Sequence, residues 1–197
     1  MLLLVGLGNI GREYELTRHN FGFLLLDQVI KDHQFQSASK KFKSEVFLGE
    51  IAGKKIIALK PQTFMNLSGL AVGEAAAFYK IEEKDIFVFH DDVDLVFGKI
   101  KTKVGGGHAG HNGLKSIDEM IGKNYTRLRL GVGRPENKEF STADYVLGKF
   151  SKEEMAEVEK INKKISKLIS ELFEGGADGF LNKLHQKEKK ENAALRD

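Results

Sequence analysis

The chain has 197 residues, 41% of them apolar, which is enough for one substantial core and short for two domains. Its 31 basic and 28 acidic side chains leave a formal charge of only +3, so the total charge by itself does not indicate a nucleic-acid partner. The chain has no cysteine, which excludes disulfides, thiolate metal sites and cysteine nucleophiles and is consistent with a reducing cytoplasm.

Short apolar runs rich in branched residues alternate with longer segments of helical period, the pattern of an α/β domain. Strands are predicted at 2–7, 45–51, 55–60, 86–90, 98–104 and 126–133. Helices are predicted at 20–32, 66–80, from about 112 onward, at 151–173 and at 177–187. Asn66 or Ser68 is the expected cap of the second helix, and Ser151 with Glu154 forms a capping box on the fourth.

The order of these elements predicts a single α/β domain over residues 1–187, with a twisted mixed β-sheet flanked by helices on both faces. The charged segment 188–197 is expected to be a frayed C-terminal tail. No stretch approaches the roughly 18 consecutive apolar residues of a membrane-spanning helix, so a soluble protein is expected.

The first predicted strand ends in a glycine-rich turn, Gly6-Leu7-Gly8-Asn9-Ile10-Gly11, that matches the dinucleotide-binding pattern G-x-G-x-x-G. In dinucleotide-binding proteins a helix begins directly at these glycines, so that its N-terminus faces the pyrophosphate. Here residues 12–18 are polar, and apolar periodicity resumes only near Phe21. We interpret the glycines as backbone freedom that lets Asn9 point into a site; the alternative is a plain turn with Asn9 exposed.

Four polar clusters lie at the ends of apolar runs and suggest one catalytic pocket. They are Gly8-Asn9 with Arg18-His19-Asn20, Phe64-Met65-Asn66, the segment 90–94 (His-Asp-Asp-Val-Asp), and the segment 107–113 (Gly-His-Ala-Gly-His-Asn-Gly). Together they supply a base, a carboxylate to orient it and neutral amides. His19 is the candidate general base, because the usual pKa of histidine lies near neutrality. Asp91, at the carboxyl end of its strand, is its expected partner, with Asp92 and Asp94 as alternatives or turn caps.

Two other kinds of catalytic site were considered. The aspartates with His90, His108 and His111 would form a metal site, and the i, i+3 spacing of the last two permits it. The surrounding glycines favour a backbone-rich loop that contacts a phosphate or peptide group, so no metal is expected. A serine hydrolase is disfavoured because the chain lacks G-x-S-x-G and because the Ser68 hydroxyl is expected to bond to backbone.

Basic side chains alternate with apolar ones in two predicted strands. Lys99, Lys101 and Lys103 share one face of the first strand, and Arg127 and Arg129 share one face of the second. Acidic partners are absent from the neighbouring sequence, which favours a phosphate-bearing ligand over a merely solvated sheet face. An RNA-binding module without catalytic turnover is the rival to an enzyme.

Taken in order, these motifs resemble those of the bacterial peptidyl-tRNA hydrolases, and the resemblance covers nearly the whole chain. The matching segments are Gly-Leu-Gly-Asn at 6–9, Tyr14, Thr-Arg-His-Asn at 17–20, Phe-Met-Asn-Leu-Ser-Gly at 64–69, His-Asp-Asp-Val-Asp-Leu at 90–95, the glycine- and histidine-rich segment 105–116, and Arg-Leu-Arg-Leu-Gly-Val-Gly-Arg-Pro at 127–135. The chain has Ile10 and Val96 where this family usually has proline, which predicts a looser backbone at both turns.

The resemblance implies an enzyme that hydrolyses the ester joining a peptide to the 3′ end of tRNA, recycling tRNA from peptides dropped by stalled ribosomes. It implies His19 as the base that activates water, Asp91 as its partner, and Asn9 as the group that distinguishes peptidyl-tRNA from aminoacyl-tRNA. Contacts to the peptide or the tRNA end are implied for Tyr14, Phe64, Met65, Asn66, His111 and Asn112, and contacts to tRNA phosphate for Lys101, Lys103 and Arg129. A cytoplasmic monomer without cofactor, membrane contact or obligatory protein partner is expected.

Overall fold

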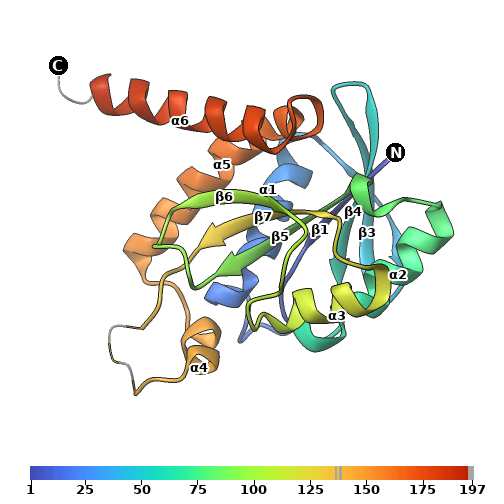
Figure 1. The fold of residues 1–197 in the computed structure, drawn as a ribbon, viewed down its shortest axis with the longest axis horizontal. Helices are drawn as coiled ribbons and strands as arrows, with labels where there is room; N and C mark the ends of the chain where they lie inside the picture. Colours follow the sequence, from blue (N-terminus) through green and yellow to red (C-terminus); the bar gives the residue numbers. More distant parts are fainter. Residues whose placement is uncertain (136, 138, 195–197) are drawn as a thin grey trace.

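Seven strands form one mixed sheet with the order β2-β3-β4-β1-β5-β7-β6 (Figure 1). The computed structural model describes residues 1–135, 137 and 139–194. The strands are β1 (Leu2–Gly6), β2 (Gln36–Lys41), β3 (Ser44–Ile51), β4 (Lys54–Pro61), β5 (Ile86–Asp92), β6 (Ile100–Val104) and β7 (Thr126–Gly131). The four central strands β4, β1, β5 and β7 are parallel, whereas β2, β3 and β6 pair antiparallel with their neighbours. The predicted mixed α/β sheet is therefore confirmed.

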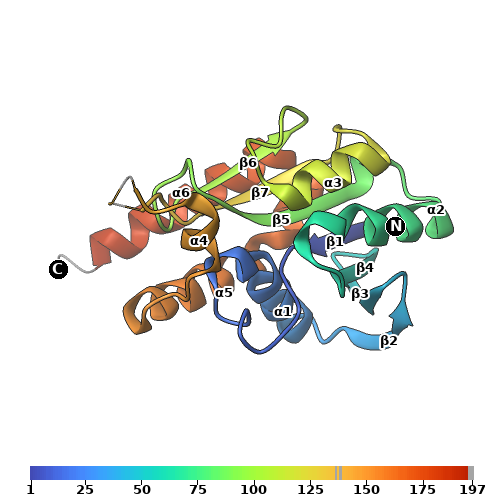
Figure 2. The same cartoon turned by 90° about the horizontal axis from the view of Figure 1, so that it is seen from below.

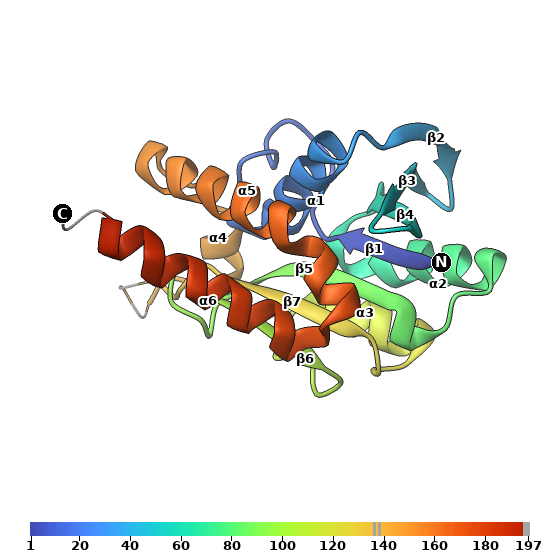
Figure 3. The ribbon, with the colours of Figure 1, turned by 90° about the horizontal axis from the view of Figure 1, so that it is seen from above.

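Helices cover both faces of this sheet. The helices α1 (Phe21–Asp32), α5 (Lys152–Glu174) and α6 (Gly176–Ala194) enclose one apolar core, and α2 (Ser68–Tyr79) and α3 (Asn112–Ile121) enclose the other. Figure 2 shows α1 and α5 on the side of the sheet opposite α3, and Figure 3 shows α6 running alongside α5 toward β6. β1 contributes to both cores, because Leu2 and Leu4 point to one face and Leu3 and Val5 to the other. No helix within the described residues combines the length and apolar character needed to cross a bilayer.

Three elements differ from the sequence-based expectation. β2 was not predicted, because its sequence Gln-Ser-Ala-Ser-Lys-Lys lacks apolar alternation and the strand exists only as a partner of β3. The short helix α4 (Thr142–Leu147) was also missed. The last helix, predicted at 177–187, extends as α6 to Ala194, because the sequence beyond residue 187 is rich in the helix formers lysine, glutamate and alanine. Residues 195–197 of the predicted tail lie outside the described residues.

Of the N-caps predicted for two helices, the one of α5 is present in the structure and the one of α2 is not. Ser151 and Glu154 form the expected capping box at the start of α5. Neither Asn66 nor Ser68 caps α2, whose N-cap is Leu67 after a short 3₁₀ turn, Met65–Leu67. The Ser68 hydroxyl instead donates to the Met65 carbonyl at 2.8 Å, so it is engaged with backbone as expected.

The first turn of α1 lies unusually close to the backbone of the sheet, which fixes the position of the start of this helix. A Cβ added at Gly22 would lie 2.2 Å from the Phe89 carbonyl oxygen and 2.6 Å from the Leu7 nitrogen. Only glycine permits this contact, so the backbone of α1 rests directly on β1 and β5. The short 3₁₀ helix η1 (Arg18–Asn20) precedes α1 and is therefore held at the same end of the sheet.

Candidate active site

The candidate site lies at the carboxyl ends of the neighbouring parallel strands β1 and β5. From β1 the chain continues to α1 on one face of the sheet and later pairs β4 beside β1, whereas from β5 it continues through the edge strand β6 to α3 on the other face and then adds β7 beside β5. This divergence makes a topological switch point, where open α/β sheets form their binding crevices. Residues 12–17 and η1 lie between the glycine-rich turn after β1 and the start of α1 at Phe21, so the helix does not begin directly at the glycines as it does in a dinucleotide-binding loop.

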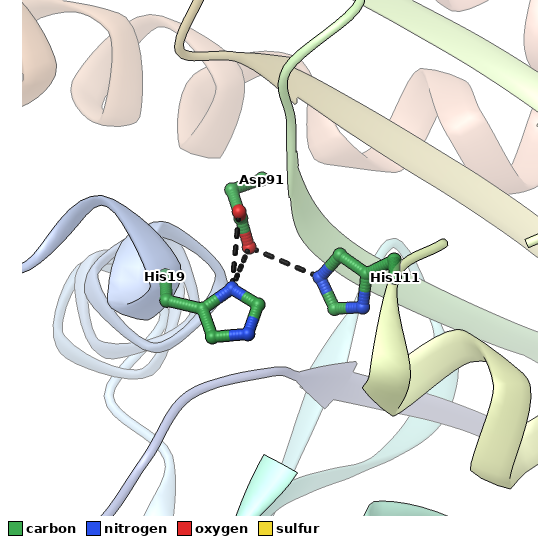
Figure 4. Close-up of side chains that lie close together, drawn as sticks. All are labelled: His19, Asp91 and His111. Atoms are coloured by element: carbon green, nitrogen blue, oxygen red, sulfur yellow. Dashed lines mark hydrogen bonds and ion pairs between the residues drawn. The ribbon is translucent and has the colours of Figure 1, made fainter. Parts of the chain in front are cut away.

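His19 and Asp91 form the centre of the site (Figure 4). The Nδ1 atom of His19 lies 2.9 Å from Oδ1 and 3.1 Å from Oδ2 of Asp91, and the carboxylate is buried. Because a carboxylate only accepts, Nδ1 carries the proton and Nε2 is left unprotonated in the neutral ring. Burial lowers the pKa of His19, but the charge of Asp91 and its hydrogen bond outweigh burial and raise the pKa above its usual value. Burial opposes ionisation of Asp91, yet His19 and His111 hold its pKa well below the usual range.

His111 contacts the same carboxylate from the other side. Its Nε2 donates to Asp91 Oδ1 at 3.0 Å. Its Nδ1 accepts the backbone N–H groups of Gly113 and Leu114 at 3.2 and 3.4 Å, so His111 is the N-cap of α3. The accepting Nδ1 puts the proton on Nε2, the atom that the carboxylate needs. The side chain that the family resemblance placed next to the substrate therefore also holds Asp91.

Asn9 is fixed from three directions. Its backbone N–H donates to Asn20 Oδ1 at 2.8 Å, and Asn20 Nδ2 donates to the Asn9 carbonyl at 2.9 Å. The Met65 N–H donates to Asn9 Oδ1 at 2.8 Å, which leaves the Asn9 amide NH₂ group for another partner. Asn9 is only 8% exposed, so the alternative of a plain turn with Asn9 exposed is wrong. Asn20 was not assigned a role in the predicted site, although it directly follows His19 in the first of the four clusters.

A cavity of about 960 Å³ opens over these residues and gathers all four polar clusters. Its walls include the predicted residues Asn9, His19, Phe64, Met65, Asn66, Asp91, Lys103, His111, Asn112 and Arg129. Within the described part of the chain, two predicted contacts do not line it: Tyr14, half-buried in the loop after β1, and Lys101, exposed on β6 opposite Arg129. The exposed side chains of Asn66 and Asn112 have no hydrogen-bond partner among the described residues, so their amides are available to a ligand.

The three aspartates at the end of β5 contact three different cationic or titratable groups. Asp91 contacts His19, Asp92 pairs with Arg129 at 2.7 Å, and Asp94 pairs with Arg134. Asp92 also accepts the Asp94 N–H at 2.9 Å and thereby closes the following turn. In the structure it is therefore Asp91 that contacts the His19 imidazole.

The metal site considered from the sequence is not formed by the described residues. His108 accepts the Gly110 N–H through Nδ1 instead. Burial lowers the pKa of His90 to about 3, and its Nδ1 donates to the Asp91 carbonyl. Among the described residues, the cluster with metal-ligand spacing is His19, Asp91 and His111, whose ligand atoms lie within 4.8 Å of one another. In this cluster His19 Nδ1 and His111 Nε2 bond to Asp91.

The two arginines of β7 share one face of the strand, as predicted, but have different environments. Arg127 is buried, pairs with Asp118 of α3 at 2.8 Å, and donates to the Gly106 and Gly107 carbonyls. It therefore anchors the glycine loop and is not available to an external ligand. Both arginines line the cavity, but the Arg129 side chain is 23% exposed and that of Arg127 only 2%, and Asp92 partly neutralises Arg129. The acidic partners were missed because they lie outside the strand itself, Asp118 nine residues from Arg127 and Asp92 37 residues from Arg129.

Two parts of the site were not foreseen. Residues Thr142, Ala143, Val146 and Leu147 of α4 add a largely apolar wall to the cavity, and the Ser141 cap of this helix is its only local signal. Arg18, next to His19, donates to Glu154 at 2.9 and 3.0 Å and to the Lys149 carbonyl, and it stacks 4.5 Å from the Tyr145 ring centroid. These contacts fasten η1, and with it the imidazole, to the start of α5.

Comparisons with known proteins identify the family of the chain. The model of the family described as peptidyl-tRNA hydrolase matches residues 3–192. The peptidyl-tRNA hydrolase of Sinorhizobium fredii is 49% identical over 93% of this chain and 77% of its own length, and that of Rickettsia bellii is 48% identical over 93% and 100%. The crystal structure of peptidyl-tRNA hydrolase from Acinetobacter baumannii superposes with a TM-score of 0.87 at 37% identity, covering 93% of this chain and 94% of that one. The chain therefore belongs to the peptidyl-tRNA hydrolase family.

Proposed function

We propose that this protein hydrolyses the ester between a peptide and the 3′ end of tRNA with a water molecule that His19 activates. The bond from His19 Nδ1 to Asp91 is the observation that carries this proposal, because it leaves Nε2 ready to accept a proton. As the water oxygen attacks the ester carbonyl, its proton passes to Nε2, and Asp91 stabilises the imidazolium. The same proton then passes to the departing 3′ oxygen of tRNA, which restores the neutral ring.

The asparagine amides supply binding and selectivity in this proposal. The free NH₂ group of Asn9 donates to the peptide, and Asn66 and Asn112 bind the peptide or the tRNA end and steady the developing oxyanion. An unblocked aminoacyl-tRNA would bring a charged ammonium into this pocket. Burying even a neutral polar group without a hydrogen-bond partner costs ~2–7 kcal/mol, and burying a charged ammonium costs more. The pocket therefore favours a substrate whose amine is acylated.

Lys101, Lys103 and Arg129 are assigned to tRNA phosphate, and Tyr14, Phe64, Met65 and His111 to the vicinity of the peptide or tRNA end. No metal or other cofactor takes part in the proposed steps. We further propose that the protein acts as a monomer without an obligatory protein partner. We assign the activity to the cytoplasm, where peptidyl-tRNA dropped by stalled ribosomes arises.

The proposed reaction is tested with purified protein, an N-acylated aminoacyl-tRNA and EDTA, with the unblocked aminoacyl-tRNA as the control. Release of the N-acylated amino acid is measured as acid-soluble label. We expect hydrolysis to persist in EDTA and to be much slower with the unblocked substrate, because its ammonium must be desolvated. Loss of activity on chelation that zinc restores would contradict the metal-independent proposal.

The assigned phosphate contacts predict a change in salt dependence. In the double variant Lys103→Ala, Arg129→Ala, tRNA binding should weaken, and the slope of log K against log salt should flatten by about one for each contact removed. Equilibrium binding of deacylated tRNA at several salt concentrations measures both effects. The matched control replaces the exposed Lys163 and Lys167 of α5, an equal change of charge away from the cavity. An unaltered slope in the first variant would remove the phosphate role.

A further inference from the structure

We infer that Asp92 is a positioning residue for tRNA binding: it holds the Arg129 guanidinium by Nε, so that both Nη groups remain for one phosphate. The inference rests on the proposed phosphate role of Arg129. The inference gives the Asp92 carboxylate a role in binding tRNA, although the negative charge of this carboxylate by itself would repel a phosphate.

The contact between the two side chains is well defined. Asp92 is the last residue of β5 and is 8% exposed, and its Oδ2 accepts Nε–H of Arg129 at 2.7 Å. Its other oxygen, Oδ1, accepts the Asp94 backbone N–H at 2.9 Å, so both carboxylate oxygens are fixed. The strand register supports the pair, since β7 carries Arg129 opposite His90, two residues before Asp92 on the adjacent strand.

The remaining donors of Arg129 are free to bind a ligand. Among the described residues, no hydrogen bond involves its Nη1 or Nη2, and the side chain lines the cavity with 23% of its surface exposed. Arginine binds phosphate best through two parallel N–H donors in one plane. A carboxylate bonded to Nε fixes this plane before the phosphate arrives, which lowers the entropy lost on binding.

If Asp92 acted only through electrostatic repulsion of the phosphate, its removal would have the opposite effect on tRNA affinity. A carboxylate next to a phosphate lowers the local positive potential, so its removal should strengthen tRNA binding if charge were the only effect. The positioning role predicts weaker binding instead. Asp94 provides a matched comparison, because it carries the same charge two residues along but pairs with Arg134 at the exposed surface.

The experiment measures KM and kcat with N-acylated aminoacyl-tRNA for Asp92→Ala, Asp92→Asn, Asp94→Ala and Arg129→Ala. We expect Asp92→Ala to raise KM by about tenfold, the size of one charge-assisted hydrogen bond, with a much smaller effect on kcat. Asp92→Asn, which retains an acceptor for the turn, should raise KM less. Asp94→Ala should leave KM unchanged or lower it, and Asp92→Glu should restore part of the affinity.

A double-mutant cycle separates the possible failures. In the Arg129→Ala background, the further change Asp92→Ala should add no increase in KM, because the group that it positions is gone. A lower or unchanged KM in Asp92→Ala and Asp92→Asn, or fully additive effects in the double variant, would overturn the inference while the phosphate role stands. If Arg129→Ala alone alters neither KM nor the salt dependence, the phosphate role fails and the inference fails with it.

Discussion

Replacing His19 by alanine should slow hydrolysis of N-acylated aminoacyl-tRNA by roughly 10²- to 10⁴-fold, the contribution of a well-placed general base. The variant loses the only group that the proposed reaction uses to take the proton from water. Binding of tRNA should survive, because the amides and cations of the cavity remain. Single-turnover rates and tRNA dissociation constants measured on the same preparation separate the two properties.

The control for His19→Ala is His185→Ala, which removes a histidine of α6 outside the cavity walls. This variant should retain the full rate. The comparison also decides between an enzyme and an RNA-binding module that uses the same basic surface. An unchanged rate in the His19 variant would reject the assigned base, and an equal loss of tRNA binding would point to a structural role.

Replacing Asp91 by asparagine should lower kcat by roughly 10²- to 10⁴-fold, as loss of the orienting carboxylate does in other histidine-based sites. The amide nearly matches the carboxylate in shape but does not stabilise the imidazolium that forms when His19 takes the proton. It also presents an NH₂ group to one of the two histidines that now donate to Asp91. Steady-state kinetics near neutral pH give the magnitude.

The pH dependence of kcat/KM in Asp91→Asn is a second test of the role of Asp91, because the direction in which its acid limb moves can be predicted. The reaction requires neutral His19, so kcat/KM rises as the pH increases through the pKa of this ring. Burial lowers that pKa, and Asp91 raises it by a larger amount. Removing the charge leaves burial unopposed, so the acid limb should move to lower pH while the plateau falls. Asp94→Asn is the control of equal charge, and an acid limb that stays in place or moves upward would contradict the proposed coupling.

Local sequence patterns were sufficient for most of the fold. The strands β1, β4 and β5 can be recognised from their apolar runs, and α5 from its apolar stripe. Burial causes these patterns: a strand buried on one face alternates with a period of two, a strand buried on both faces is a continuous apolar run, and a half-buried helix has a helical period. β2 has no such pattern and depends on pairing with β3, so its sequence contains no sufficient signal. The predicted last helix, 177–187, was too short for a different reason. The high charge density beyond residue 187 was interpreted as disorder, although the same residues favour helix.

The sequence by itself determined the family, the residue types of the site and the ends of the strands that carry them. Only the tertiary structure decided that Asp91 meets His19, that Asp92 holds Arg129, and that Arg127 is buried against Asp118. It also revealed the clamp of Asn20 on Asn9 and the apolar wall of α4. The physical reason is that propensity and periodicity act over a few residues, whereas His19 and Asp91 are 72 residues apart and meet because β1 and β5 are neighbours in the sheet.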